Sequence, residues 1–229
     1  MTFVKICGIT DVDDALLAVA LGADSIGLNF VSGSVRQIAP GRARDIVARI
    51  PPETMNVGIF RNEAKERVVD IVHTAGLNAA QLHGDESPEE VAWVAQRVPT
   101  VIKAVSAGTG QAAHAGEFDV PIILVDGIKP GSGETFDWSL AASLPTNKRI
   151  LLAGGLHPDN VAEAIAAVKP WGVDVASGVE REPGRKDPSA LRKFIQNAKA
   201  AGKLLEETAG SAGETPHDAE EKLYDWEVE

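Results

Sequence analysis

Two residues that can transfer protons stand at the ends of mostly apolar segments of the chain. Cys7 closes the segment 3–7, and Asp126 follows the segment 122–125. A thiolate is a base, and a carboxyl group beside an apolar run is poorly solvated, which suits a proton donor. Each residue also has an ordinary interpretation, because free cysteines are often packing residues and Asp-Gly pairs are common in turns. Together the two are candidates for acid–base catalysis.

Two pairs of small residues indicate a phosphate site. Gly154-Gly155 and Ser177-Gly178 each follow an apolar segment and precede a helical pattern or turn. Glycine lets the backbone approach a ligand closely, and free N–H groups at the start of a helix bind phosphate. Paired glycines after a strand can instead form a tight turn. The equivalent placement of the second pair favours phosphate binding over that alternative.

Further polar residues stand near the ends of other apolar segments, namely Asn29, Arg36, Gln81, His83 and Lys103. His83 can also be a hydrogen-bonded structural residue. His157, which precedes Pro158, is expected to cap a helix. Cys and His residues do not recur at the spacing of metal ligands, so the sequence indicates no metal.

Short apolar segments alternate with amphipathic ones along the chain. Eight strands are predicted, most of them rich in Val and Ile as in parallel strands buried on both faces. They are 3–7, 25–30, 55–60, 79–82, 101–104, 122–125, 150–153 and 173–176. Helices are predicted at 11–21, 40–50, 64–75, 88–97, 139–143, 158–168 and 188–200. Thr10 is the expected N-cap of the first, and glycines make segment 108–117 the poorest helix.

This order of elements fits a closed barrel or an open, doubly wound sheet. A spacing of roughly 20–25 residues per unit favours the barrel. No Gly-x-Gly-x-x-Gly turn follows the first strand, which argues against a dinucleotide-binding sheet. We therefore expect an α/β fold made of a single (βα)₈ TIM barrel. In such barrels the active site lies at the carboxyl ends of the strands, where the candidate residues stand.

The barrel is expected to span residues 1–205 and to be followed by a short acidic C-terminal tail, 206–229. The tail holds nine acidic residues and one lysine, a net charge of −8, which leaves −3 of the total −11 on the body. Small polar residues at 208–216 are typical of a linker, so we expect a mobile tail. Leu223, Tyr224 and Trp226 leave a docking segment as the alternative. The near-neutral body predicts no nucleic-acid partner, because phosphate backbones need a basic face.

The sequence also indicates where the protein works. It lacks a run of about 18 apolar residues, so no membrane-spanning helix is expected. The first residues lack the layout of a signal peptide. Cys7 is the single cysteine and forms no intramolecular disulfide, which fits a reducing cytoplasm.

Longer motifs of the chain resemble those of the phosphoribosylanthranilate isomerase family. The opening Lys-Ile-Cys-Gly at 5–8 and the late Gly-Val-Asp-Val-Ala-Ser-Gly-Val-Glu at 172–180 are together quite specific. Further matches are Gly-Leu-Asn-Phe at 27–30, Gln-Leu-His-Gly at 81–84 and Leu-Val-Asp at 124–126. The resemblance covers residues 3–200, nearly the whole expected barrel.

The resemblance implies an Amadori rearrangement of N-(5-phosphoribosyl)anthranilate in tryptophan biosynthesis. It implies Asp126 as the general acid on the ring oxygen and Cys7 as the general base at C2. Arg36 would bind the anthranilate carboxylate. Other substrate contacts are implied for His83 and Asp174, and phosphate contacts for Gly154, Gly155, Ser177 and Gly178. The partner would be this small phosphosugar, bound by a monomer or homodimer, and no cofactor is needed because only protons move.

The chain departs from the family pattern in its second loop. The family commonly has Ser-Pro-Arg where this chain reads Ser34-Val35-Arg36, and losing the proline is expected to loosen the loop that presents Arg36. A second departure is Gly127, which stands where the family often has a small polar residue.

Two other functions stay open. One is another phosphosugar isomerase or epimerase barrel. The histidine-pathway isomerase would need an aspartate at position 7, and the epimerase would need metal ligands that are absent at Phe30 and Phe60. The other is a non-catalytic phosphate-binding barrel, which is expected to have lost Cys7 or Asp126.

Overall fold

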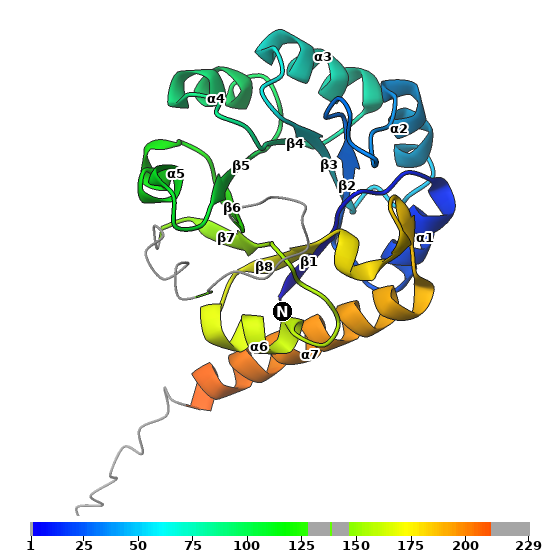
Figure 1. Ribbon diagram of the computed structural model, residues 1–229, viewed down its shortest axis with the longest axis vertical. Coiled ribbons are helices and arrows are strands. Elements are labelled where there is room, and N and C mark those ends of the chain that lie inside the picture. The colour runs from blue at the N-terminus through cyan, green and yellow to red at the C-terminus, as the bar shows by residue number, and fades with distance from the viewer. Residues whose placement is uncertain (1, 128–137, 139–146, 212–229) are drawn as a thin grey trace, which may run out of the picture.

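The protein is a closed barrel of eight parallel strands with helices around it (Figure 1). The computed structural model describes residues 2–127, 138 and 147–211. The strands follow one another around the barrel in chain order, and β8 pairs with β1 to close it. The expected (βα)₈ TIM barrel is therefore confirmed.

The strands agree with the predicted segments to within two residues at either end. They are β1 Phe3–Ile6, β2 Ser25–Asn29, β3 Met55–Phe60, β4 Ala79–Leu82, β5 Val101–Ser106, β6 Ile122–Asp126, β7 Arg149–Leu152 and β8 Gly172–Val175. Nearly every strand residue is buried, because one face meets the barrel interior and the other meets the helices.

Side chains inside the barrel form an apolar floor below the carboxyl ends of the strands. Along β6, Ile122 and Leu124 belong to this cluster, and Asp126 is the next residue on the same face. Leu151 and Ala153 repeat the pattern along and just beyond β7. A larger apolar cluster joins the outer faces of the strands to the helices.

The helices cover the outside of the barrel in the predicted order. They are α1 Val12–Ala20, α2 Pro40–Val47, α3 Lys65–Ala75, α4 Pro88–Ala95, α5 Gly110–Ala113, α6 Val161–Val168 and α7 Pro188–Ser211. The glycine-rich segment forms only α5 and the 3-10 turn η1 (Ala115–Glu117), as its composition predicts. The helix predicted at 139–143 lies outside the described residues. A second 3-10 turn, η3 (Ser177–Val179), and a hairpin of β9 (Glu180–Glu182) and β10 (Arg185–Lys186) follow β8.

The N-cap of α1 is Asp11, so the prediction of Thr10 is wrong. The Asp11 Oδ1 atom accepts the backbone N–H of Asp14 at 2.9 Å, which satisfies one of the free donors at the helix start. The Thr10 hydroxyl instead donates to the Gly184 carbonyl at 2.6 Å. Thr10 therefore ties the loop after β1 to the β9–β10 hairpin.

Helix α7 is longer than predicted, because it continues past Ala200 to Ser211. Its second half packs on the start of the chain: a Cβ at Gly202 would lie 2.1 Å from Thr2 Oγ1. The helix thus runs through position 205, where the sequence predicts the end of the barrel. None of the helices in the described ranges combines the length and apolarity needed to cross a membrane.

Candidate active site

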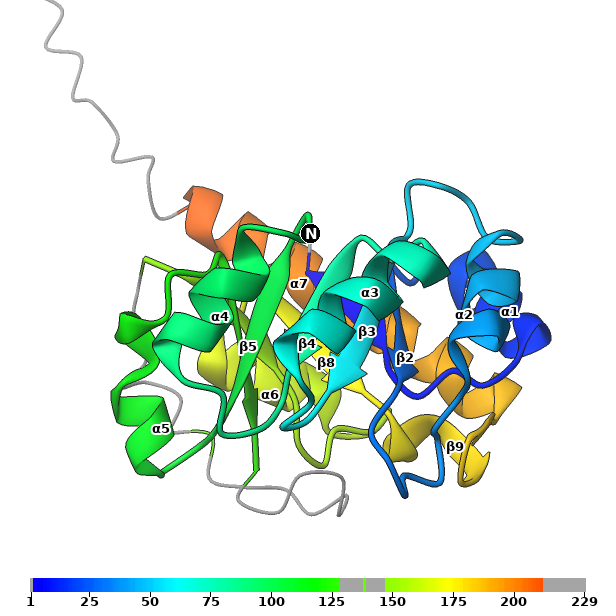
Figure 2. The same cartoon turned by 90° about the horizontal axis from the view of Figure 1, so that it is seen from above.

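A pocket of about 450 Å³ opens at the carboxyl ends of the strands. In Figure 2 this end is the lower one, where β9 and the loop after β2 lie, whereas the N terminus lies at the upper end. The pocket is lined by most of the candidate residues, namely Cys7, Asn29, Arg36, Gln81, His83, Asp126, Gly154, Gly155, Asp174 and Ser177. Its volume suits a small-molecule ligand.

Cys7 lies directly after β1, between β8 and β2. Its backbone N–H donates to Val175 at 2.8 Å, so the base candidate is tied to the carboxyl end of β8. Burial raises the pKa of the Cys7 thiol above its ordinary value, although the positive charges of Lys5 and Lys186 act in the opposite direction. The thiol is therefore difficult to ionise in these surroundings.

A buried ion pair lies below Cys7 inside the barrel. Lys5 stands directly opposite Asp174 in the β1–β8 register, and Lys5 Nζ lies 2.9 Å from Asp174 Oδ1. Burial lowers the pKa of Lys5, but the charges and hydrogen bonds of Asp174 and Cys7 together outweigh burial and leave that pKa raised. Lys5 therefore carries a positive charge two residues before Cys7 on the same face of β1.

Asp126 ends β6 with a buried side chain. Its Oδ1 atom accepts the Gly127 N–H at 2.7 Å. Asp126 therefore makes the contact expected of an Asp-Gly turn and also lines the pocket. Its Oδ2 atom lies 3.5 Å from His83 Nε2, and His83 Nδ1 lies 3.1 Å from Gln81 Nε2. His83 Nε2 is buried without a hydrogen-bond partner in the described part of the chain.

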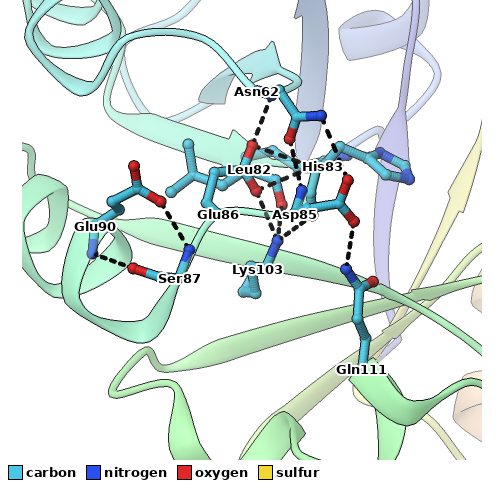
Figure 3. Close-up of polar contacts among 11 residues, drawn as sticks. Asn62, Leu82, His83, Asp85, Glu86, Ser87, Glu90, Lys103 and Gln111 are labelled. Carbon is cyan, nitrogen blue, oxygen red and sulfur yellow. Dashed lines mark hydrogen bonds and ion pairs between the residues drawn. The ribbon is translucent and has the colours of Figure 1, made fainter.

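A second buried cation supports the loop that carries His83 (Figure 3). Lys103 Nζ donates to the carbonyls of Leu82 and Gly84 at 3.4 and 2.7 Å and to Glu86 Oε2 at 2.7 Å. Lys103 points away from the barrel interior, so its expected place among the residues around the site is wrong. Its role is to hold the loop after β4.

Arg36 reaches the pocket from the loop after β2. Its Nε and Nη2 atoms donate to both oxygens of Glu180 at 2.8 and 2.7 Å. These bonds raise the pKa of Arg36 despite its partial burial. The loop without the family's proline is held by other bonds: Asn29 Nδ2 donates to Ser34 Oγ at 3.1 Å, and Ser34 Oγ accepts the Arg36 N–H at 3.2 Å.

The expected phosphate residues lie after β7 and β8. Gly154 and Gly155 have φ angles of 83° and 64°, a conformation that favours glycine. The N–H groups of Gly154, Gly155 and Ser177 donate to no described residue. Gly178 does not line the pocket, and a Cβ there would lie 1.9 Å from the Leu156 carbonyl oxygen. It allows the two loops to touch.

Sequence reasoning assigned no role to Lys5, Arg61, Glu180 or Lys186. Arg61 lines the pocket with an exposed side chain. The signal that could have identified Lys5 is the alternation of strand residues, which places it on the same face as Cys7, two positions away. Glu180 lies in the motif at 172–180, but its pairing with Arg36 and Lys186 depends on tertiary contact. Within residues 2–127, 138 and 147–211, no three His, Cys, Asp or Glu side chains form a group that could hold a metal ion.

His157 lies in the turn before α6. Its Nδ1 atom accepts the Asp159 N–H at 3.3 Å, and the N-cap of the helix is Asn160. The prediction that His157 caps the helix is therefore wrong, because its side chain bonds within the preceding turn.

Comparisons with known proteins agree on one family. The model of the N-(5'-phosphoribosyl)anthranilate isomerase family matches residues 4–197. The isomerase of this name from Desulforudis audaxviator is 46% identical over 205 residues, covering 88% of this chain and all of that protein.

Solved structures are similar in the same way. A phosphoribosyl anthranilate isomerase in complex with reduced 1-(o-carboxyphenylamino)-1-deoxyribulose 5-phosphate has a TM-score of 0.77 and 42% identity over 87% of this chain and 100% of that one. Monomers generated from the dimeric isomerase of Thermotoga maritima have a TM-score of 0.78 and 41% identity, with the same coverage.

Proposed function

The chain belongs to the N-(5'-phosphoribosyl)anthranilate isomerase family and catalyses an aldose–ketose isomerisation of tryptophan biosynthesis, and from this premise we propose that Cys7 and Asp126 are its base and acid. The reaction converts N-(5'-phosphoribosyl)anthranilate to 1-(2-carboxyphenylamino)-1-deoxyribulose 5-phosphate. It breaks the bond between C1 and the ring oxygen and moves hydrogen from C2 to C1. No electron leaves the substrate, so the proposal needs no redox cofactor.

Asp126 donates a proton to the ring oxygen in the first step. The C1–O bond breaks as the anthranilate nitrogen supplies its electron pair, and an iminium ion forms. The buried position of Asp126 at the end of β6 supports this role, because bulk water then does not compete with the carboxyl group as the proton donor to the ring oxygen.

Cys7 removes the C2 proton in the second step. The cationic iminium makes this proton acidic and also stabilises a thiolate nearby. The electrons of the C–H bond form the enolamine, which becomes the ketose when C1 takes up a proton and the C2 hydroxyl loses one. Lys5 and Lys186 support the role of Cys7 because their positive charges oppose the effect of burial on the thiol.

The two ends of the substrate carry negative charge and bind at different loops. Arg36 pairs with the aromatic carboxylate through the part of its guanidinium that Glu180 leaves free. The backbone at Gly154, Gly155 and Ser177 binds the phosphate, with Gly178 allowing the loops to meet. His83 Nε2 has no hydrogen-bond partner in the described part of the chain and lies 3.5 Å from Asp126 Oδ2, and it contacts the sugar together with the pocket-lining Asp174.

The protein acts on this small molecule as a monomer or homodimer in the cytoplasm, without a nucleic-acid or membrane partner. The dimeric relative and its engineered monomers support the range of assembly states. Sedimentation and cell fractionation test the assembly and the location.

The observation that carries the assignment is the convergence of Cys7 and Asp126 on one pocket with Arg36 and the glycine loops. The test follows the loss of anthranilate fluorescence from freshly made substrate. Cys7→Ala and Asp126→Asn should each lower kcat by about 10²- to 10⁴-fold, because each removes a proton-transfer group.

Asp119→Asn is the matched control, since Asp119 is exposed and precedes β6 at the end of the barrel opposite the pocket. It should leave the rate unchanged. Near-wild-type rates from folded Cys7→Ala or Asp126→Asn would refute the assignment of acid and base.

A further inference from the structure

Three charged side chains form a buried network beside the pocket. Glu180 Oε1 lies 2.9 Å from Lys186 Nζ, and Glu180 also accepts two bonds from Arg36. The side chains of Glu180 and Lys186 are 4% and 0% exposed, and that of Arg36 is 16% exposed. The least buried member is thus the one at the pocket.

Lys186 ties this network to the rest of the site. Its ammonium group also donates to the carbonyls of Cys7 at 2.6 Å and Ala176 at 3.2 Å. One cation therefore joins the end of β1, the loop after β8 and the carboxylate that holds Arg36. Lys186 is on β10, in the hairpin that follows the barrel's last strand.

The aliphatic part of the Arg36 side chain is held in place as well as its guanidinium group. A Cβ at Gly8 would lie 2.4 Å from Arg36 Cδ, so the arginine passes closely over this glycine, whose φ is 74°. Glu180 occupies the edge of the guanidinium formed by Nε and Nη2. The edge formed by Nη1 and Nη2 has geometry suited to a second carboxylate.

We propose that Glu180, anchored by Lys186, is the positioning residue that orients Arg36 so that its second edge meets the aromatic carboxylate of the substrate. This inference rests on the proposed role of Arg36. Glu180 touches Arg36 and not the reacting atoms. It acts by restricting the rotamers of a long side chain before the substrate arrives, which removes an ordering cost from binding.

We expect changes at Glu180 to affect only the binding of the aromatic carboxylate. The probes are reduced 1-(o-carboxyphenylamino)-1-deoxyribulose 5-phosphate and the same compound without the ring carboxyl group. The full-length protein should bind the first more tightly than the second. Glu180→Gln should lower this preference on the order of tenfold, the effect expected for a hydrogen bond to a charged group, and leave the second affinity unchanged.

Three further variants make the result specific. Glu182→Gln, an exposed change in the same hairpin, should keep the wild-type preference. Arg36→Gln should abolish it. Glu180→Asp keeps the charge beside Lys186 but is too short to bond both Arg36 nitrogens, so it should lose preference even where Glu180→Gln fails to fold.

Each failure has a distinct signature. If Arg36→Gln still prefers the probe with the ring carboxyl group, the proposed role of Arg36 is refuted, and the inference about Glu180 is refuted with it. If Arg36→Gln loses the preference while both Glu180 variants keep it, only the positioning role is overturned. Equal loss of both probes in the Glu180 variants would show a structural role instead, and would also overturn the inference.

Discussion

The base candidate stands in surroundings that resist its ionisation. Cys7 is flanked by two buried cations, Lys5 and Lys186, yet burial prevails and raises the thiol pKa. Asp174 neutralises the nearer cation through the 2.9 Å ion pair and itself adds negative charge beside the thiol. The thiolate is thus favoured mainly once the cationic intermediate is present.

This balance predicts how activity depends on pH. A general base acts when deprotonated and a general acid when protonated, so Asp126→Asn, which lacks the titrating acid, isolates the effect of Cys7 on the rate. The residual kcat/KM of Asp126→Asn should rise with pH and level off only above the ordinary thiol pKa of about 8.5. A pH–rate profile between about pH 7 and 10 checks this, since the substrate phosphate, with a second pKa of about 6, is already ionised there.

Lys5→Met serves as a probe of the same balance. Combined with Asp126→Asn, it removes the positive charge that lowers the thiol pKa, so the rise of kcat/KM should move to higher pH. A profile of Asp126→Asn that levels off well below pH 8 would contradict the raised thiol pKa.

At the scale of elements, two loops of the site depend on close backbone contact. Gly178, in η3, lies against the carbonyl of Leu156, in the loop after β7. The backbone groups proposed to bind phosphate come from these two loops. The distance between the loops therefore decides whether the N–H donors of Gly155 and Ser177 reach the same phosphate. A methyl group at position 178 would separate them.

Gly178→Ala should therefore weaken phosphate binding and fold stability together. The added Cβ would lie 1.9 Å from a backbone oxygen, which cannot move as a flexible side chain can. We expect a loss of about 1–3 kcal/mol of unfolding free energy and a raised KM, measured by denaturant unfolding and steady-state kinetics.

Gly41→Ala is the matched control, because nothing lies within 4 Å of a Cβ at that position in α2. It should leave KM unchanged and keep or slightly raise stability. An unchanged KM in Gly178→Ala would show that the contact does not set the phosphate site.

At the scale of the whole molecule, α7 returns the chain to its start. Lys199 Nζ donates to the Thr2 carbonyl at 3.1 Å, and Gly202 packs against Thr2. Leu205 is half-buried against the outer core. The last helix therefore stabilises β1, on which Cys7 depends.

Truncation tests how much of the C-terminal region the barrel needs. A chain ending at Ser211 keeps all of α7 and should retain its Tm and kcat/KM. A chain ending at Ala200 loses the contacts of Gly202 and Leu205, and should lose about 2 kcal/mol or more of unfolding free energy. A lowered Tm in the longer of the two would refute the predicted mobile tail, because residues 212–229 would then stabilise the fold.

The amino-acid sequence by itself predicted the barrel and the residues proposed to carry out the chemistry. Eight apolar runs of strand length predict eight parallel strands, and residues directly after such strands must gather at one end. That rule predicted one pocket for Cys7, Asp126, Gly154, Gly155 and Ser177 before any contact was known, and all five line it. The start of the helix predicted at 88–97 was also correct, because Ser87 and Glu90, which are neighbours in the chain, form a capping box there.

Tertiary structure alone decided which charged groups pair. Lys5 meets Asp174, 169 positions away, and Arg36 meets Glu180, 144 positions away. The wrong placement of Lys103 at the site also has a tertiary cause. Parallel strands are apolar on both faces, so their sequence pattern does not reveal which face points into the barrel. Period-two alternation gives the relative side of each residue, and only closure of the barrel assigns that side to the pocket or to the helices.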